Sequence, residues 1–228
     1  MKFNNPSLVL YFVATIFAVI GVTFNYETFE LIAKPMIVPS IYFFYVQLCK
    51  GEINLLFTTA VFCSFAADMI VLINLPNGTL PIAFLNICMY SIFTYFILTD
   101  IGIKSFVNKK VISLIGFSVF FLFVLTVILD LMKGMDQLEF NVFVFYGILL
   151  SILSALICYN HLNKSSLRSY YALLMCICFI VSDVFFAIYN FYLKIDIFVS
   201  LNVAGQFISY YYMVKYITST NDLLEEKT

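Results

Sequence analysis

The sequence predicts an all-α, polytopic membrane protein: a bundle of eight transmembrane helices with both termini in the cytoplasm. Hydrophobic residues make up 63% of the 228 residues, charged residues make up only 11%, and the mean hydropathy is +1.02. The apolar residues also fall into eight runs, each near the length of about 20 residues that crosses a bilayer. Such a composition excludes a water-soluble globular domain.

The runs are separated by short stretches of charged or turn-forming residues. In chain order, the first three separators are Asn25-Tyr26-Glu27, Lys50-Gly51-Glu52 and Pro76-Asn77-Gly78. Connections this short make consecutive helices antiparallel and leave no room for a soluble domain. The first run is too long for a signal-peptide core and lacks a cleavage site, so we expect a retained helix. The predicted spans are 8–25, 31–49, 53–74, 79–98, 111–132, 140–160, 169–193 and 196–217, within a single domain 1–218 and before a polar cytoplasmic tail 219–228.

Lysine and arginine are unevenly distributed between the two ends of the predicted bundle. Only Lys133 and Lys194 fall on the side opposite the termini, and Lys34 lies within a span. Because loops rich in Lys and Arg stay in the cytoplasm, the distribution predicts cytoplasmic termini and supports the count of eight spans. The residues on the side of the termini are Lys2, Lys50, Lys104, Lys109, Lys110, Lys164, Arg168, Lys215 and Lys227.

Charge balance and cysteine placement exclude several classes of function. The 12 Lys and Arg residues against 13 Asp and Glu residues offer no basic surface, so we expect no nucleic-acid partner. The six cysteines lie in or beside apolar runs, and we interpret them as small buried hydrophobes. The single histidine, His161, is predicted at the cytoplasmic end, away from the acidic residues within the spans, which argues against a zinc site or a serine–histidine–aspartate centre. We therefore expect neither a metal nor a cofactor.

Ionisable residues within the spans are the strongest functional signal. A charge in the hydrocarbon core costs a few kcal/mol, so such a residue needs a partner, water or a task. At 1.5 Å per residue, Asp68 lies about 9 Å and Asp183 about 15 Å from the non-cytoplasmic end of its helix, and Lys34 lies about one turn in. Other polar residues reach similar depths, namely Asn86, Tyr146, Asn202 and Gln206. This clustering in depth predicts a water-containing cavity in the outer half of the bilayer.

Helical spacing supports such a cavity. Ser64 and Asp68 are four residues apart and share a helix face, as do Asn202 and Gln206. Pro35 and Pro39 free backbone carbonyls beside Lys34. The alternative for this span is a simple proline kink, with Lys34 reaching out to the membrane interface. We interpret the run Tyr210, Tyr211 and Tyr212 as part of an interfacial aromatic belt.

Two buried carboxyl groups in one cavity suit two kinds of chemistry. Burial disfavours the charged form of a carboxyl group, so one of Asp68 and Asp183 is expected to be neutral. One neutral acid and one carboxylate together suit general acid–base hydrolysis through an oxocarbenium-like transition state. The same pair is equally suited to carrying protons in a transporter. Composition does not separate these two possibilities.

Several motifs resemble the YhhN-like lysoplasmalogenases, a family of eight-helix integral membrane proteins. Lys34-Pro35 resembles the early K-P element of the family, Ser64 to Asp68 its S-x-x-G-D, and Ser182-Asp183 its S-D. Tyr146 and Gln206 stand where the family has a tyrosine and a glutamine. The sequence differs at three motif positions: Ala67 replaces the glycine, Asn202 replaces a tyrosine, and the fourth-helix histidine has no counterpart near Asn86 and Cys88.

The resemblance implies hydrolysis of the vinyl ether bond of lysoplasmalogens taken from the bilayer, giving a fatty aldehyde and a glycerophospho-base. Asp183 is expected to be the acid and Asp68 to assist water, or the reverse. The alternatives are a small-molecule or proton-coupled transporter and a catalytically inactive, lipid-binding member of the same fold. We expect the protein in a bacterial cytoplasmic membrane. The residues expected to orient substrate and water are Lys34, Ser64, Asn86, Tyr146, Ser182, Asn202 and Gln206.

Overall fold

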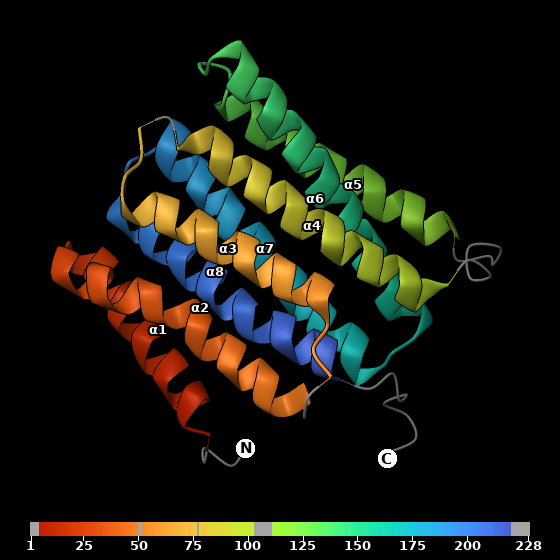
Figure 1. Ribbon diagram of the computed structural model, residues 1–228. Helices are drawn as coiled ribbons and strands as arrows, with labels where there is room; N and C mark the ends of the chain where they lie inside the picture. The colour runs from red at the N-terminus through yellow and green to blue at the C-terminus, as the bar shows by residue number, and fades with distance from the viewer. Residues whose placement is uncertain (1–4, 50–51, 77, 103–110, 220–228) are drawn as a thin grey trace.

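The computed structural model is a bundle of long antiparallel helices (Figure 1). It describes residues 5–49, 52–76, 78–102 and 111–219. Within these ranges there are eight α-helices and no strand, and every helix is long and apolar enough to cross a membrane. The prediction of an all-α bundle of eight membrane-spanning helices is therefore confirmed. The helices are α1 (Pro6–Phe24), α2 (Glu27–Cys49), α3 (Leu55–Leu72), α4 (Thr79–Ile101), α5 (Val111–Leu131), α6 (Gln137–Asn163), α7 (Leu167–Phe191) and α8 (Asp196–Thr218).

Several helices extend past the apolar runs that predict them. Helix α6 begins three residues before the predicted span, because the side chain of Asp136 caps it by accepting a hydrogen bond from the Leu138 amide. Helix α7 begins early for a similar reason: Ser166 and Ser169 form a reciprocal capping box. Hydropathy thus locates the part of a helix within the bilayer, whereas capping residues decide where the helix starts.

The start of α1 and the end of α8 lie at the same end of the bundle, which we call the terminal end; the opposite end, with the loops after α1, α3, α5 and α7, is the distal end. Which end faces the cytoplasm stays a prediction. Several residues behind that prediction lie outside the described residues, namely Lys2, Lys50, Lys104, Lys109, Lys110 and Lys227, as does the tail from residue 220 onward.

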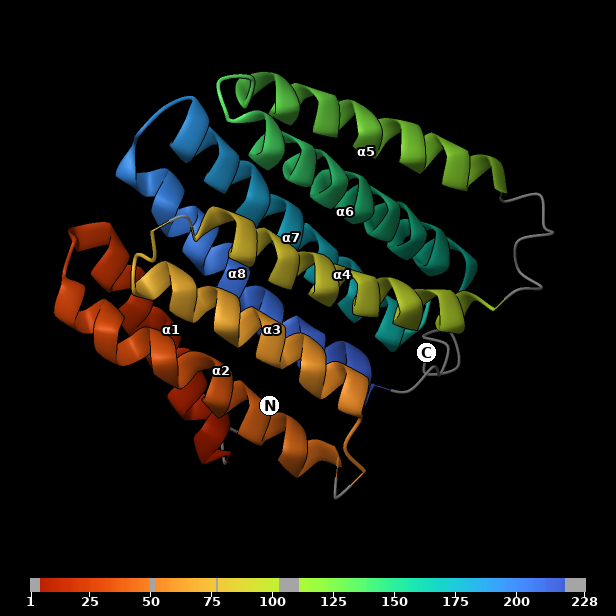
Figure 2. The ribbon, with the colours of Figure 1, turned by 45° about the horizontal axis from the view of Figure 1, so that its top comes forward.

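Six of the described helices form a closed ring. Around it, α2 packs against α3, α3 against α4, α4 against α6, α6 against α7, α7 against α8, and α8 back against α2. Helix α1 lies outside the ring against α2 and α8, while α5 lies outside it on the other side, against α6 and α7 (Figure 2). Helix α5 consequently exposes much of its surface, and Leu125 is its one buried residue among those described.

Aromatic side chains fill the terminal half of the ring. Tyr45, Phe57, Phe93 and Tyr216 are almost completely buried there. The ring centroid of Phe93 lies 6.4 Å from that of Phe57 and 6.3 Å from that of Tyr216. Such edge-to-face and tilted pairs are favourable packing geometries for aromatic rings. This half of the bundle therefore has a solid core.

A glycine allows α7 and α8 to approach closely. A Cβ atom added at Gly205 would lie 3.2 Å from the carbonyl oxygen of Cys178 and 3.3 Å from the amide nitrogen of Ser182. Small residues at such crossings are a common means of joining membrane helices. Helix α1 is attached to the same region, because the Tyr11 hydroxyl donates to the carbonyl oxygen of Phe207 on α8.

The interpretation of all six cysteines as buried is wrong for Cys88, which is exposed on the outside of α4. Cys63 and Cys176 are buried, and the other three are partly buried. The physical reason is that the outer surface of a membrane bundle faces lipid and is as apolar as its interior. Apolar neighbours in the sequence therefore do not show which of the two surfaces a residue occupies.

Replacing Gly205 with leucine should destabilise the bundle, because the added side chain must push α7 away from α8. We expect a loss of about 2 kcal/mol in the free energy of unfolding, visible as a lower thermal midpoint in detergent. The control is Gly116→Leu on α5, where an added Cβ meets no atom within 4 Å. Equal midpoints for the two variants would contradict the close approach.

Candidate functional site

A cavity of about 460 Å³ lies in the distal half of the bundle. Its lining comes from all six helices of the ring and, on one side, from α5. This volume is within the range of small-molecule binding sites. The structure brings to this cavity every residue that the sequence proposes for the site, and their roles stay predictions. These residues are Lys34, Ser64, Asp68, Asn86, Tyr146, Ser182, Asp183, Asn202 and Gln206.

Asp68 is held by two side chains of α8. Gln206 Nε2 donates to Asp68 Oδ1 at 2.6 Å, and the Tyr210 hydroxyl donates to Oδ2 at 2.9 Å. The Asp68 residue is only 5% exposed, so these donors supply hydrogen bonds that bulk water cannot. One turn before it on α3, the Ser64 hydroxyl lines the cavity and donates to the carbonyl oxygen of Ala60.

The assignment of Tyr210 and Tyr211 to an interfacial aromatic belt is wrong, because both residues are buried and Tyr210 is bonded to Asp68. The reason is helical geometry. Three consecutive residues of a helix point in directions about 100° apart, so they cannot all face the membrane interface. The spacing of four residues from Gln206 is the signal that identifies Tyr210, and Gln206 Nε2 also donates to its hydroxyl at 3.2 Å.

Asp183, on α7, is held by a tyrosine from each of two other helices of the ring, α4 and α6. The Tyr146 hydroxyl of α6 donates to Asp183 Oδ2 at 2.6 Å, and the Tyr90 hydroxyl of α4 donates to the same oxygen at 3.1 Å. The two hydroxyl groups are 3.2 Å apart. Tyr90 is absent from the sequence-based site, although its position one turn after Asn86 places both residues on one face of α4.

The two carboxyl groups are held separately. Among the described residues, no hydrogen bond joins Asp68 to Asp183, and their donors come from different helices. Asp68 belongs to the side of the cavity formed by α3 and α8, and Asp183 to the side formed by α4, α6 and α7. Both nevertheless line the same cavity. A ligand within it can therefore contact one carboxyl group from each side.

Lys34 is buried and paired with a residue that the sequence interpretation omits. Its ammonium group forms an ion pair with Glu30, one turn earlier on α2, and the lysine residue is 8% exposed. Lys34 also lies close enough to Asp68 for electrostatic attraction. The lysine is thus part of a charged row, Glu30, Lys34 and Asp68, that runs from α2 to the cavity.

Ser182 and Asn202 join α7 to α8 beside the carboxyl groups. Asn202 Nδ2 donates to both the carbonyl oxygen and the hydroxyl oxygen of Ser182, each at 2.9 Å. Because these bonds cross between helices, they fix the relative position of Asp183, the neighbour of Ser182, and Gln206, one turn after Asn202.

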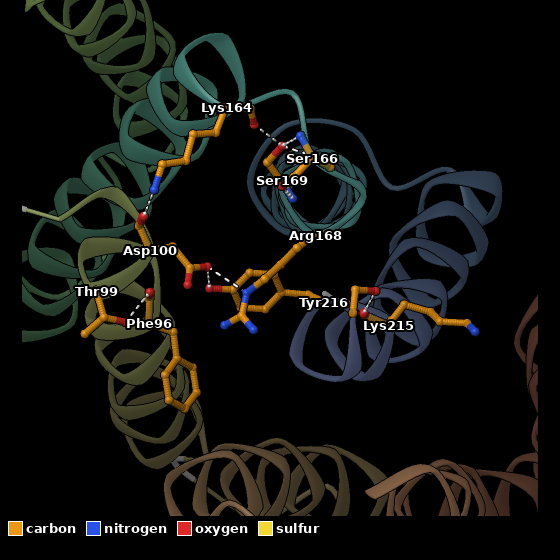
Figure 3. Close-up of polar contacts among 10 residues, drawn as sticks. Phe96, Thr99, Asp100, Lys164, Ser166, Arg168, Ser169, Lys215 and Tyr216 are labelled. Carbon is orange, nitrogen blue, oxygen red and sulfur yellow. Dashed lines mark hydrogen bonds and ion pairs between the residues drawn. The ribbon is translucent and has the colours of Figure 1, made fainter. Parts of the chain in front are cut away.

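A second polar cluster closes the terminal end of the bundle (Figure 3). Arg168 Nε and the Tyr216 hydroxyl both donate to Asp100 Oδ2, at 2.9 and 2.7 Å. The guanidinium carbon of Arg168 lies 4.7 Å from the centroid of the Tyr216 ring. Lys164 Nζ donates to the carbonyl oxygen of Asp100 at 3.0 Å. The cluster therefore joins α4, α7, α8 and the end of α6 at the side of the bundle away from the cavity.

No family model, no curated protein and no solved structure matches the chain. The resemblance to the YhhN-like lysoplasmalogenases remains a prediction. The functional inference therefore rests on the residues of the cavity.

Removal of the Asp100 charge should weaken the terminal end strongly. In Asp100→Asn the mostly buried Arg168 loses its anionic partner, and we expect the free energy of unfolding to fall by about 3 kcal/mol. The matched control is Asp130→Asn, because Asp130 pairs with Lys133 where both side chains are exposed to the surroundings. Thermal midpoints in detergent compare the two variants. Equal midpoints would mean that the cluster does not stabilise the fold.

Proposed function

We propose that the chain is a membrane-embedded hydrolase that cleaves the vinyl ether bond of single-chain, lysoplasmalogen-type lipids by carboxyl acid–base catalysis. One observation carries the proposal: Asp68 and Asp183 line one cavity inside the bundle and are held there by separate donors. Vinyl ether hydrolysis needs an acid and a base on a bound, largely apolar molecule. A cavity with a carboxyl group on each side provides both.

Asp183 is the proposed acid. Cleavage begins when a proton is transferred to the vinyl carbon remote from oxygen, so that the double-bond electrons form the new carbon–hydrogen bond and an oxocarbenium ion remains. The hydrogen-bond donors to Asp183 are the neutral hydroxyl groups of Tyr90 and Tyr146. Among the described residues no cationic side chain forms an ion pair with Asp183, whereas Lys34 lies near Asp68. Apolar surroundings without a positive charge favour a protonated carboxylic acid.

Asp68 is the proposed base. Its donors, Gln206 and Tyr210, and the nearby positive charge of Lys34 suit a carboxylate. This carboxylate takes a proton from water as the water oxygen bonds to the oxocarbenium carbon. The resulting hemiacetal separates into a fatty aldehyde and a glycerophospho-base, and the proton returns to Asp183 through water in the cavity. One water molecule is consumed, and both carboxyl groups return to their starting states.

The position of the cavity favours a hydrolase over a transporter. A transporter exposes its site to each face of the membrane in turn. In this chain the cavity and the polar residues that line it lie in the distal half, while Phe57, Phe93 and the Asp100 cluster fill the terminal half. A lipid hydrolase needs access from only one side, or from the bilayer.

Replacing either carboxyl group should abolish most of the activity. Purified protein in detergent is given lysoplasmalogen and, separately, the ester-linked lysolipid, and aldehyde release is measured. We expect aldehyde from lysoplasmalogen alone and a loss of at least about 100-fold in Asp68→Asn and in Asp183→Asn, because each removes a general acid or base. Asp130→Asn, which changes an exposed carboxyl group of α5, should retain full activity.

The assay also distinguishes the alternatives. Aldehyde release that is unchanged in both variants would rule out the carboxyl mechanism. Wild-type protein that releases no aldehyde but gives pH-dependent flux in liposomes would be a transporter. Wild-type protein that binds the lysolipid without turnover or flux would be a lipid-binding protein of this fold.

A further inference from the structure

One side of the cavity extends beyond the ring of helices and is formed by α5. The α5 residues that line it recur every three or four positions along the sequence. Residues at this spacing share one face of a helix, so they form one stripe along α5. All of them are apolar. The opposite face of α5, with Phe120, Phe123 and Val127, is exposed. The stripe consists of Phe121, Val124, Leu125, Ile128 and Leu129, and Met132 continues it just after the helix.

Helix α6 supplies the facing wall. Phe143, Gly147 and Leu150 line the same cavity, and α5 packs against α6 and α7 from outside the ring. A Cβ atom at Gly147 would overlap Leu125 Cδ1, so the leucine occupies the space left by the glycine. We use the name lateral chamber for the part of the cavity bounded by the α5 stripe and these three α6 residues. Figure 2 shows α5 as the outermost helix on this side.

The lateral chamber meets the polar part of the cavity at Asp183. Tyr146 lies on α6 between Phe143 and Leu150, three and four residues from them, and its hydroxyl donates to Asp183. Asp183 lies on α7, which packs against α5 and against α8, and Asp68 and Lys34 line the same cavity from α3 and α2. The α5 side of the cavity is therefore apolar, and Asp183, the carboxyl group proposed as the acid, lies on a helix that packs against α5.

We propose that the lateral chamber holds the alkyl chain of a single-chain lipid, which enters from the bilayer beside α5, while the polar head lies towards Asp68 and Lys34. The assignment of that lipid as a substrate rests on the proposed function. From Phe121 to Met132 the stripe is about 16 Å long at 1.5 Å per residue. A chain in this position places its junction with the head group, the bond to be cleaved, beside Asp183.

A groove on the outer surface of the bundle is the competing site for an alkyl chain. It lies between α4 and α6, and its lining includes Phe84, Ile87, Leu138 and Phe145. Phe84 and Phe145 are more than half exposed, as expected of a surface in contact with lipid. Neither Asp68 nor Asp183 lines this groove. A chain bound here would be an ordinary boundary lipid.

Photolabelling tests the lateral chamber without depending on turnover. The probe is a lysophospholipid with a saturated, ether-linked chain that carries a diazirine at its far end, and labelled residues are located by mass spectrometry. We expect labelling of the α5 stripe and of Phe143, Gly147 and Leu150, reduced about tenfold by excess unlabelled ether lysolipid. If the label is confined to the outer groove, or if the competitor does not reduce it, the proposal that the lateral chamber binds the alkyl chain is rejected.

Variants of adjacent α5 residues supply a matched pair. Ile128→Trp places a larger side chain in the chamber. It should lower about tenfold the labelling that unlabelled ether lysolipid can compete away, because overpacking a binding site lowers its affinity about tenfold or more. Val127→Trp places the same side chain on the exposed face and should leave labelling unchanged. Ile128→Ala, which removes volume, should retain it. Equal labelling of folded Ile128→Trp and Val127→Trp proteins would contradict the proposal, and labelling of the wild type decides the question if Ile128→Trp does not fold.

Aldehyde release from lysoplasmalogen by the same wild-type preparation separates the two proposals. Competed labelling of the chamber without aldehyde would retain the chain-binding site and reject the hydrolase. Aldehyde release with labelling confined to the outer groove would retain the hydrolase and reject the lateral chamber.

Discussion

The placement of two carboxyl groups inside a bundle of apolar helices is the constraint on which the distal half of the structure depends. A carboxyl group in such a place must receive hydrogen bonds from neighbouring helices, because lipid supplies none. For Asp68 these come from Gln206 and Tyr210, and for Asp183 from Tyr90 and Tyr146. The four donors belong to α4, α6 and α8, so satisfying two acids fixes the arrangement of the ring around them.

The two halves of the ring differ because they meet different demands. The terminal half buries large aromatic rings and a charge cluster in which Asp100 is shared by Arg168 and Tyr216. That half is tightly packed by these side chains. The distal half must leave space beside its acids, so helix contacts there depend on individual polar bonds such as that between Asn202 and Ser182. The tightly packed terminal half thus supports the distal half, which contains the cavity. Rigid support of this kind is what holds the side chains of a site in place.

The sequence predicts the number of helices and the residues of the cavity better than it predicts their partners. Span length and polarity depend on each helix separately, which is why Asp68 and Asp183 stand out from the order of amino acids alone. Tyr90, Tyr210 and Asp100 do not, since a tyrosine or a helix-end aspartate is equally typical of a membrane interface. Only the packing of distant helices shows which of them meets an acid. Cys88 illustrates the same limit. Lipid and the protein interior are both apolar, so an apolar sequence does not show which of them a residue contacts.

The position of Asp183 connects the proposed chemistry to the shape of the cavity. An acid that protonates carbon must lie beside the reacting bond, and in a single-chain lipid that bond joins an apolar chain to a polar head. Asp183 lies on α7, which packs against α5, whose stripe is the apolar side of the cavity, and against α8, whose Gln206 binds Asp68. Because α5 is outside the ring, a chain can be accommodated there without separating the helices that hold the two acids. Binding and acid–base chemistry can therefore use different helices of one bundle.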